Sequence, residues 1–260
     1  MPAPTYVITS RANPSVKQLR AAFAGQARLS GGLVAIEGDH LVLEALQSGM
    51  VLKTVFISER RPVPDEVPKS VEVLRLANDV FRSCVETQSP QGIAALLVPP
   101  VGSVEKMLRN TPLILVAQAL QDPGNLGTLV RSAEAFGATG VLTTLGGVSP
   151  WNQKCIRASA GSVFRLPVAQ ADEAAVALLK SHKVQFLAAM PTNAIPIEQA
   201  DLKLPTALLI GNEGAGLDAE WTALADRRIT IPTPGRVESL NAAVAGSLLL
   251  YEASRQRASR

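Results

Sequence analysis

The chain has 260 residues, of which 47% are hydrophobic and only 4% aromatic, so it can build one large domain or two ordinary domains with aliphatic cores. Its two distant cysteines and its two histidines in separate segments argue against a disulfide framework and a metal site. The absence of a hydrophobic leader or of an apolar run near ~20 residues argues against secretion and a membrane span. We therefore expect a cytoplasmic protein with no membrane partner, and its net charge of +3 permits an anionic partner without requiring one.

The first hundred residues predict alternating helices and strands. Residues 13–25 predict a helix that Asn13 caps and Pro14 begins. The pattern then predicts strands at 33–38, 52–58, 71–77 and 92–98 and helices at 39–49 and 78–86. This alternation is typical of an α/β layer structure. The first thirty residues contain basic side chains and no acid, which indicates either a solvated end or a surface for an anion.

Prolines flank residues 101–111, so we expect a domain at 1–100, a linker at 101–111 and a second domain at 112–260. The second half predicts strands at 113–118, 140–145, 163–169, 184–190, 206–211 and 227–232, and helices after Asn125 and at 153–161, 173–183 and 239–257. These strands are almost continuously apolar, which predicts a mostly parallel sheet with both faces covered.

The last predicted helix is unusually apolar. Leu240, Val244, Leu248 and Tyr251 form one stripe along it, and Leu249 and Leu250 extend the apolar surface beyond that stripe. Such a helix is either a central core element or part of an interface between subunits. The pattern leaves both interpretations open.

Three glycine-bearing polar turns follow predicted strands of the second half: "DPGNLGTLVR" (122–131), "LLIGNEGAGL" (208–217) and "IPTPGRVESLN" (231–241). Each turn alone can be structural, with glycines for tight turns and Asn125 or Ser239 as helix caps. Ligands of parallel α/β sheets bind at the carboxyl ends of the strands, so three such turns together indicate one site. None contains the G-x-G-x-x-G spacing of a nicotinamide dinucleotide site, which argues against that enzyme class.

The extended segments "DPGNLGTLVRSAEAFGA", "LLIGNEGAGL" and "IPTPGRVESLNAAVAGSLLLYE" resemble, in order and spacing, the three motifs of the SpoU (TrmH-like) family of RNA ribose methyltransferases in the SPOUT superfamily. The resemblance covers roughly residues 111–255. Near the N-terminus, "ITSRANPSVKQLR", "AIEGDHLVLEAL" and "TQSPQG" are similar to the substrate-binding domain of such enzymes, which has a small ribosomal-protein-like α/β fold that binds RNA.

The resemblance implies a parallel sheet with a deep trefoil knot and a transfer of methyl from S-adenosylmethionine to a ribose 2′-hydroxyl of structured RNA. It favours ribosomal RNA of the large (23S-type) subunit as the substrate. A transfer-RNA methyltransferase and a non-catalytic RNA-binding assembly factor are the alternatives. It also implies a homodimer through the last helix, which would account for the apolar surface around Leu249 and Leu250.

The family motifs also assign roles to single residues. The implied catalytic residues are Asn125, Arg131, Glu213, Ser239 and Asn241; the implied cofactor-binding residues are Gly211, Ile231 and Leu240; and the implied RNA-binding residues are Arg157, Arg11, Lys17 and Arg20. Arg131 is the candidate either for a base that removes the hydroxyl proton or for an electrostatic clamp. A free guanidinium stays protonated up to a pKa above ~12, so the base role would require strong desolvation.

Overall fold

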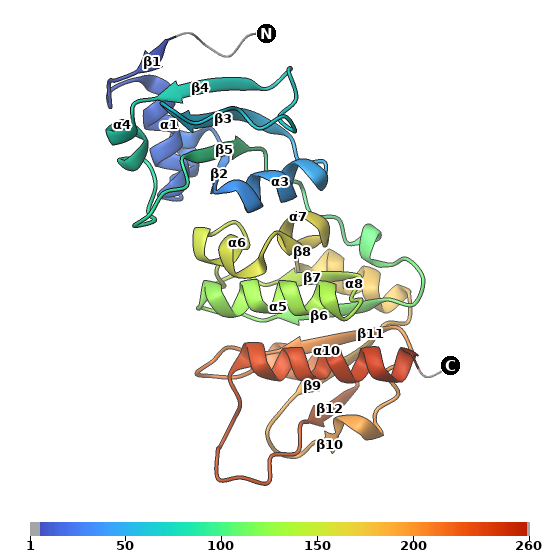
Figure 1. Cartoon of the computed structure of the whole chain (residues 1–260). Coiled ribbons are helices and arrows are strands. Elements are labelled where there is room, and N and C mark those ends of the chain that lie inside the picture. Colours follow the sequence, from blue (N-terminus) through green and yellow to red (C-terminus); the bar gives the residue numbers. More distant parts are fainter. Residues whose placement is uncertain (1–5, 259–260) are drawn as a thin grey trace. The chain divides into compact units, whose positions relative to one another are not determined.

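The computed structural model describes residues 6–258 and shows two compact units, divided between Pro100 and Val101 (Figure 1). Both units are α/β, as the alternation of elements predicted. Within the described residues, no helix combines the length and the apolar composition needed to cross a membrane.

The N-terminal unit is a five-stranded mixed sheet with helices. Its strand order is β1-β4-β3-β5-β2, with β1 at Val7–Ile8, β2 at Val34–Glu37, β3 at Leu52–Ser58, β4 at Glu72–Leu76 and β5 at Ile93–Leu97. The helices are α1 (Pro14–Phe23), α2 (Ala27–Ser30), α3 (Asp39–Gln47) and α4 (Asn78–Arg82). Asn13 caps α1 as predicted, because its side chain accepts a hydrogen bond from the amide of Ser15. The short β1 and α2 carry no periodic pattern and were missed.

The C-terminal unit contains a seven-stranded sheet in the order β10-β12-β9-β11-β6-β7-β8, and every strand pairing is parallel, which confirms the predicted parallel sheet. Its strands are β6 (Leu113–Ala117), β7 (Gly140–Thr143), β8 (Val168–Gln170), β9 (Gln185–Ala189), β10 (Ile195–Pro196), β11 (Thr206–Ile210) and β12 (Arg227–Thr230). The central strands β6 and β11 are completely buried. The trefoil knot stays a prediction.

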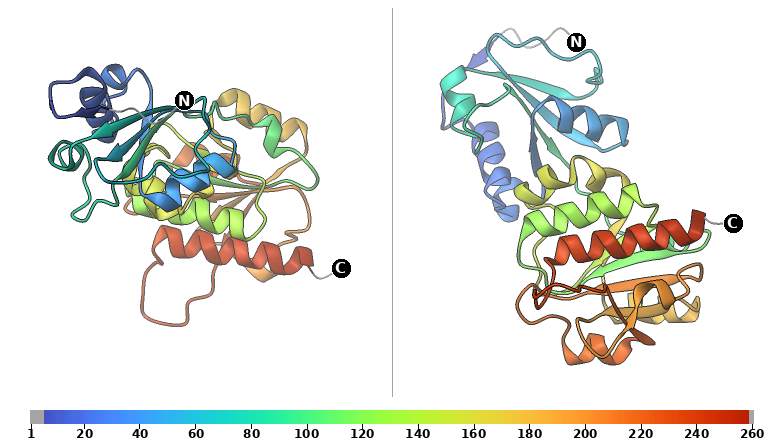
Figure 2. Two further views of the ribbon diagram at one scale, coloured as in Figure 1. Left: turned by 45° about the horizontal axis from the view of Figure 1, so that its top comes forward. Right: turned by 60° about the horizontal axis from the view of Figure 1, so that its bottom comes forward.

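Helices cover both faces of this sheet. They are α5 (Pro123–Ala135), α6 (Gln153–Ser159), α7 (Ser162–Arg165), α8 (Glu173–Ser181), α9 (Ala219–Leu224) and α10 (Ala242–Ala258), with short 3-10 turns at Glu105–Met107 and Ile197–Gln199. One core includes side chains of α8 and α9, and α10 lies alongside α5 on the opposite face (Figures 1 and 2). Residues 101–111 pack onto this unit, because Met107 is fully buried and Gly102 lies against the backbone of β8.

Two predicted elements have different bounds in the structure. Helix α5 begins at Pro123, before Asn125, because Asp122 is its N-cap and proline suits the first helical position. The strand predicted at 163–169 is helical up to Arg165, and only Val168–Gln170 forms β8. Between α6 and α7 the backbone is left-handed at Ala160 and Gly161, which ends one helix and starts the next.

The two apolar surfaces of the last helix have different environments in the structure. Leu249 and Leu250 are fully buried in the core of their own unit, so the expectation that they supply a subunit interface is wrong. The exposed apolar side chains are instead Val244, Leu248 and Tyr251, which lie on the outer face of α10. The inner face is tightly packed: a Cβ on Gly246 would lie 2.3 Å from Leu129 Cδ2 of α5.

The two cysteines are buried, and we expect neither to react in the native protein. Burial raises the pKa of the Cys155 thiol to about 12 and also raises that of Cys84. At pH 8 the thiolate fraction of Cys155 is then on the order of one in ten thousand. Iodoacetamide at pH 8, followed by mass spectrometry, is expected to leave Cys155 unmodified until the protein is denatured. Alkylation of native Cys155 as fast as that of free cysteine would contradict this.

Candidate active site

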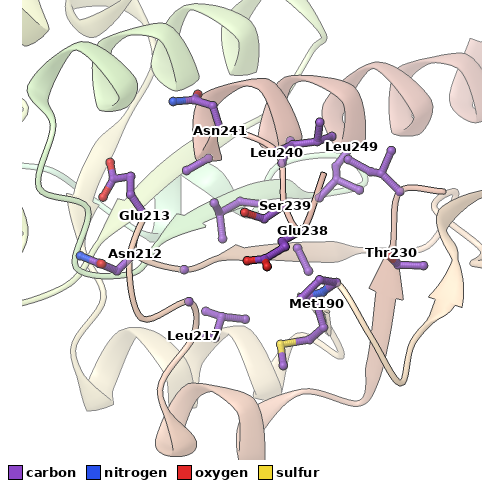
Figure 3. A pocket seen from close by; sticks show the side chains of 18 of the residues that line it. Met190, Asn212, Glu213, Leu217, Thr230, Glu238, Ser239, Leu240, Asn241 and Leu249 are labelled. Atoms are coloured by element: carbon purple, nitrogen blue, oxygen red, sulfur yellow. The ribbon is translucent and has the colours of Figure 1, made fainter. Parts of the chain in front are cut away.

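Two of the three polar turns line a cavity of about 570 Å³ at the carboxyl edge of the C-terminal sheet (Figure 3), and the first turn contacts both of them through Asn125. The cavity lies between the turn after β11, the segment that leads from β12 into α10, and the end of β9. Leu217, Leu240 and Leu249 supply apolar surface, and Glu213, Glu238 and Ser239 supply polar groups. A volume of this size and a mixed lining are typical of a small-molecule site.

The turn after β11 folds back on itself and forms one wall of the cavity. Asn212 and Gly216 exchange backbone hydrogen bonds of 3.1 and 2.9 Å. Gly211 allows this close return, because a Cβ there would lie 2.2 Å from backbone atoms of both Gly216 and Leu217. The side chain of Asn212 reinforces the turn by donating to the carbonyl of Ala119 at 2.8 Å.

Asn125 joins the three turns. Its Nδ2 donates to Glu213 Oε1 at 2.9 Å, and its Oδ1 accepts from Asn241 Nδ2 at 3.2 Å. Asn241 Oδ1 in turn accepts from the amides of Ala243 and Val244, so Asn241 caps α10. Three candidate catalytic residues from separate motifs therefore form one hydrogen-bonded group beside the cavity.

The carboxylate of Glu213 is held in its ionised form. Partial burial raises its pKa, but hydrogen bonds from the Asn125 side chain and from backbone amides, including those of Gln121 and Asp122, outweigh that effect and leave the pKa below its ordinary value. At neutral pH this side chain is an acceptor that fixes the turn before α5. Its hydrogen bonds go to Gln121, Asp122 and Asn125 and not to Arg131.

Arg131 and Arg157 lie outside this group. Arg131 is exposed on α5, about 9 Å further along the helix than Asn125 and rotated by roughly 240° from it. Within residues 6–258 its guanidinium makes no hydrogen bond or ion pair. Arg157 is exposed on α6. Neither arginine lines the cavity.

The three candidate cofactor residues, Gly211, Ile231 and Leu240, all line the cavity, as does the candidate catalytic Ser239. The sequence did not point to the end of β9, where Ala189, Met190 and Pro191 complete the lining. The sequence carries little indication that β9 contributes to the cavity, because that strand ends without a polar motif. Glu238 was also missed, although it directly precedes a residue that was selected (Figure 3).

The basic residues of the N-terminal unit have unequal freedom. Lys17 is exposed, and Arg11 is exposed with an ion pair of 3.5 Å to Asp79. Arg20 is half-buried, and its guanidinium donates to the carbonyl and the hydroxyl of Ser83 at 3.3 and 3.2 Å. Arg20 thus connects α1 to the end of α4, whereas Lys17 and Arg11 present their charge outward.

The cavity suits S-adenosylmethionine. Its apolar walls match an adenine ring, and residues of the turn at 211–217, whose close return Gly211 permits, line it. Residues Gly211, Ile231 and Leu240 would hold the cofactor. Among residues 6–258, no three His, Cys, Asp or Glu side chains gather in a group that could bind a metal ion.

Comparison with known proteins identifies the family of each unit. Residues 112–251 match the SpoU rRNA Methylase family, and residues 13–95 match the MRM3-like substrate binding domain. The 23S rRNA (guanosine(2553)-2'-O)-methyltransferase RlmP of Bacillus subtilis is 34% identical over 245 residues, which cover 94% of this chain and 97% of that protein.

Two solved structures match this chain over nearly its full length. The SpoU methyltransferase AviRb of Streptomyces viridochromogenes, in complex with the cofactor AdoMet (S-adenosylmethionine), has a TM-score of 0.86 at 27% identity and covers 95% of this chain and 99% of its own. The AdoMet-bound rRNA methyltransferase of Sinorhizobium meliloti has a TM-score of 0.84 at 29% identity, over 96% and 97% of the two chains. Because the family match extends over more than half of the 260 residues, the resemblance of the three motifs is confirmed, and the chain belongs to the SpoU rRNA methylase family of RNA 2′-O-ribose methyltransferases.

Proposed function

We propose that this protein transfers a methyl group from S-adenosylmethionine to a ribose 2′-hydroxyl in ribosomal RNA of the large subunit. The observation that carries the proposal is the hydrogen-bonded group of Asn125, Glu213 and Asn241 beside the cavity, which joins all three family motifs. The substrate class is supported by the 23S rRNA named for the Bacillus subtilis relative and by the substrate-binding match at 13–95.

The chain's own residues have two tasks in this reaction, because a ribose hydroxyl is a weak nucleophile at neutral pH. Bound S-adenosylmethionine supplies the electrophilic methyl group. The protein must place the hydroxyl in line with that group and make loss of its proton easier. The group formed by Asn125, Glu213 and Asn241 fixes the polar edge of the site, and Ser239 adds a hydroxyl to the cavity wall.

We assign Arg131 the role of an electrostatic clamp. Among residues 6–258 its guanidinium is exposed and makes no hydrogen bond or ion pair, so its donors are available to a phosphate. A free guanidinium is well suited to hold an RNA phosphate and to stabilise the alkoxide that forms as the proton leaves. Arg157, Lys17 and Arg11 are the further phosphate contacts of the proposal.

A methyl-transfer assay tests the proposed function. The protein is incubated with labelled S-adenosylmethionine and total RNA from cells that lack its gene, and the label is mapped by mass spectrometry of RNA fragments. Label on one ribose 2′-oxygen of large-subunit RNA is the expected result. Label on transfer RNA would change the substrate class. No label on RNA, on precursors or on ribosomal particles would favour the non-catalytic assembly factor.

We further propose that the protein acts in the cytoplasm as a homodimer that buries the outer face of α10. Val244, Leu248 and Tyr251 are 49%, 42% and 53% exposed and form an apolar surface on one helix. Leu248→Glu would bury an unpaired carboxylate in such an interface, so the dimer dissociation constant is expected to rise at least about 100-fold. Analytical ultracentrifugation measures this.

The matched control is Leu29→Glu, which places the same charge at an exposed leucine of the N-terminal unit. It is expected to leave the association state unchanged. A wild-type protein that is monomeric at all concentrations, or a Leu248→Glu variant that associates normally, would contradict the proposed interface.

A further inference from the structure

Lys154 connects helix α6 to the polar turn that carries Asn125, although it lies outside the three motifs. Its Nζ forms an ion pair of 2.8 Å with Asp122 Oδ2. The lysine side chain also lies over the first turn of α5, since a Cβ on Gly124 would be 3.0 Å from Lys154 Cε. Asp122 is therefore paired with a cation from a different helix, and the side chain of that lysine passes close to Gly124.

Asp122 passes this contact on to Asn125. While Oδ2 binds Lys154, Oδ1 accepts from the amides of Gly124 and Asn125 at 2.5 and 3.0 Å. The side chain of Asn125 then bridges Glu213 and Asn241. A continuous series of contacts thus runs from Lys154 through Asp122 and Asn125 to the second and third motifs, which contain Glu213 and Asn241.

The charge of Lys154 matters at this position because the substrate is a polyanion. Asp122 and Glu213 bring two carboxylates to the same turn, and the amide of Asp122 is itself directed at Glu213 Oε1 at 3.5 Å. The Lys154 ammonium is the cation that balances Asp122, and its hydrogen bond is the main reason that the pKa of Asp122 is lowered. Without Lys154, the first turn of α5 would present an unbalanced negative charge to the RNA.

We propose that Lys154 is a positioning residue for methyl transfer: it neutralises and orients Asp122, which holds Asn125 between Glu213 and Asn241. This inference rests on the proposed function. It makes Lys154 act through Asp122 and not through a contact of its own with RNA. The two modes differ in a measurable way, because only the first depends on the charge of Asp122.

A double-mutant cycle of Lys154→Ala and Asp122→Asn separates the modes. Asparagine caps helices about as well as aspartate, so Asp122→Asn removes the charge and keeps the acceptor for the amides of Gly124 and Asn125. For each variant we would measure kcat, the KM for RNA, the dissociation constant of S-adenosylmethionine by calorimetry, and the thermal unfolding midpoint.

Lys154→Ala alone is expected to lower kcat by about 10-fold or more, because small displacements of a positioned group cost that much. The KM for RNA and the cofactor dissociation constant are expected to stay within about twofold. In the Asp122→Asn background the same substitution is expected to change kcat by less than about twofold. Lys154→Arg keeps the cation and should retain most of the activity, and Lys180→Ala, at an exposed lysine of α8, serves as the matched control.

Three results would overturn the inference. The first is an unchanged kcat in Lys154→Ala. The second is an equal loss of kcat in the wild-type and Asp122→Asn backgrounds, and the third is a rise in the KM for RNA with kcat unchanged; both would indicate that Lys154 contacts RNA directly. If Lys154→Ala is unfolded, Lys154→Arg and Asp122→Asn still decide: a folded Lys154→Arg variant whose kcat falls by about 10-fold or more, or whose KM for RNA rises with kcat unchanged, would also overturn the inference. A wild-type protein without methyl transfer would overturn the proposed function as well, whereas an active wild type with additive variants would overturn this inference alone.

Discussion

Arg131→Ala is expected to lower kcat for RNA methylation by about 100- to 1000-fold or more, because it removes the cation assigned to the forming alkoxide and the adjacent phosphate. Binding of S-adenosylmethionine is expected to be unchanged, since Arg131 does not line the cavity. Single-turnover kinetics with saturating RNA and calorimetry with the cofactor alone measure the two effects separately.

Two further variants sharpen the Arg131 result. Arg131→Lys keeps the charge and loses the planar fork, so it is expected to recover only part of the activity. Arg109→Ala removes another exposed arginine, which precedes β6 at the edge of the sheet opposite the site, and is expected to be fully active. Near-normal turnover by Arg131→Ala would exclude the clamp that we assign to this residue.

Gly211→Ala is expected to weaken S-adenosylmethionine binding by about 10- to 100-fold, because displacing packed atoms costs roughly 1–3 kcal/mol. The added methyl group would lie 2.2 Å from backbone atoms of Gly216 and Leu217, and backbone cannot rotate away as a side chain does. The turn would have to open, which disrupts the paired hydrogen bonds between Asn212 and Gly216. Calorimetry on the purified variant measures the loss.

Gly214→Ala is the matched control for this variant. It adds the same methyl group in the same turn, but its nearest neighbour would be Asn212 Oδ1 at 3.5 Å, an ordinary contact. Its cofactor affinity is expected to stay near that of the wild type. Equal losses for Gly211→Ala and Gly214→Ala would indicate that the turn is sensitive to any side chain, and would remove the specific role of the close approach at Gly211.

Local patterns in the sequence predicted most of the helices and strands. The strands of the C-terminal sheet are continuous apolar runs, and continuous runs occur where both faces of a strand are buried. The cap at Asn13 follows from a side-chain oxygen placed directly before a proline-started helix. The prediction of a strand at 163–165 was wrong, because these residues are helical. The left-handed backbone at Ala160, which the hydrophobic pattern does not indicate, changes the path of the chain just before them.

The candidate site was only partly predictable. The three polar turns could be selected because ligand sites in parallel sheets occur at strand ends. Gly211, Ser239 and Asn241 were selected within these turns by their resemblance to the family motifs. The contribution of β9 was not predictable, because its position between β11 and β12 follows from strand order and not from any residue in that strand. Lys154 gave no signal either, since a single lysine on a short helix has many possible neighbours.

The sequence by itself determined the α/β class, the family and the identity of the polar turns, because these depend on residues close together in the chain or on motifs that the family shares. Only the tertiary structure decided which face of α10 is buried, that Asn125 pairs with Glu213 and Asn241, and that Arg131 stays apart from them. Those contacts join residues about ninety or more positions apart in the chain, and the packing of β6, β11, α5 and α10 brings them together. Periodicity shows that a helix has an apolar side, but which of two apolar sides becomes core depends on the shape of the element packed against it, as Leu129 and Gly246 show for α5 and α10.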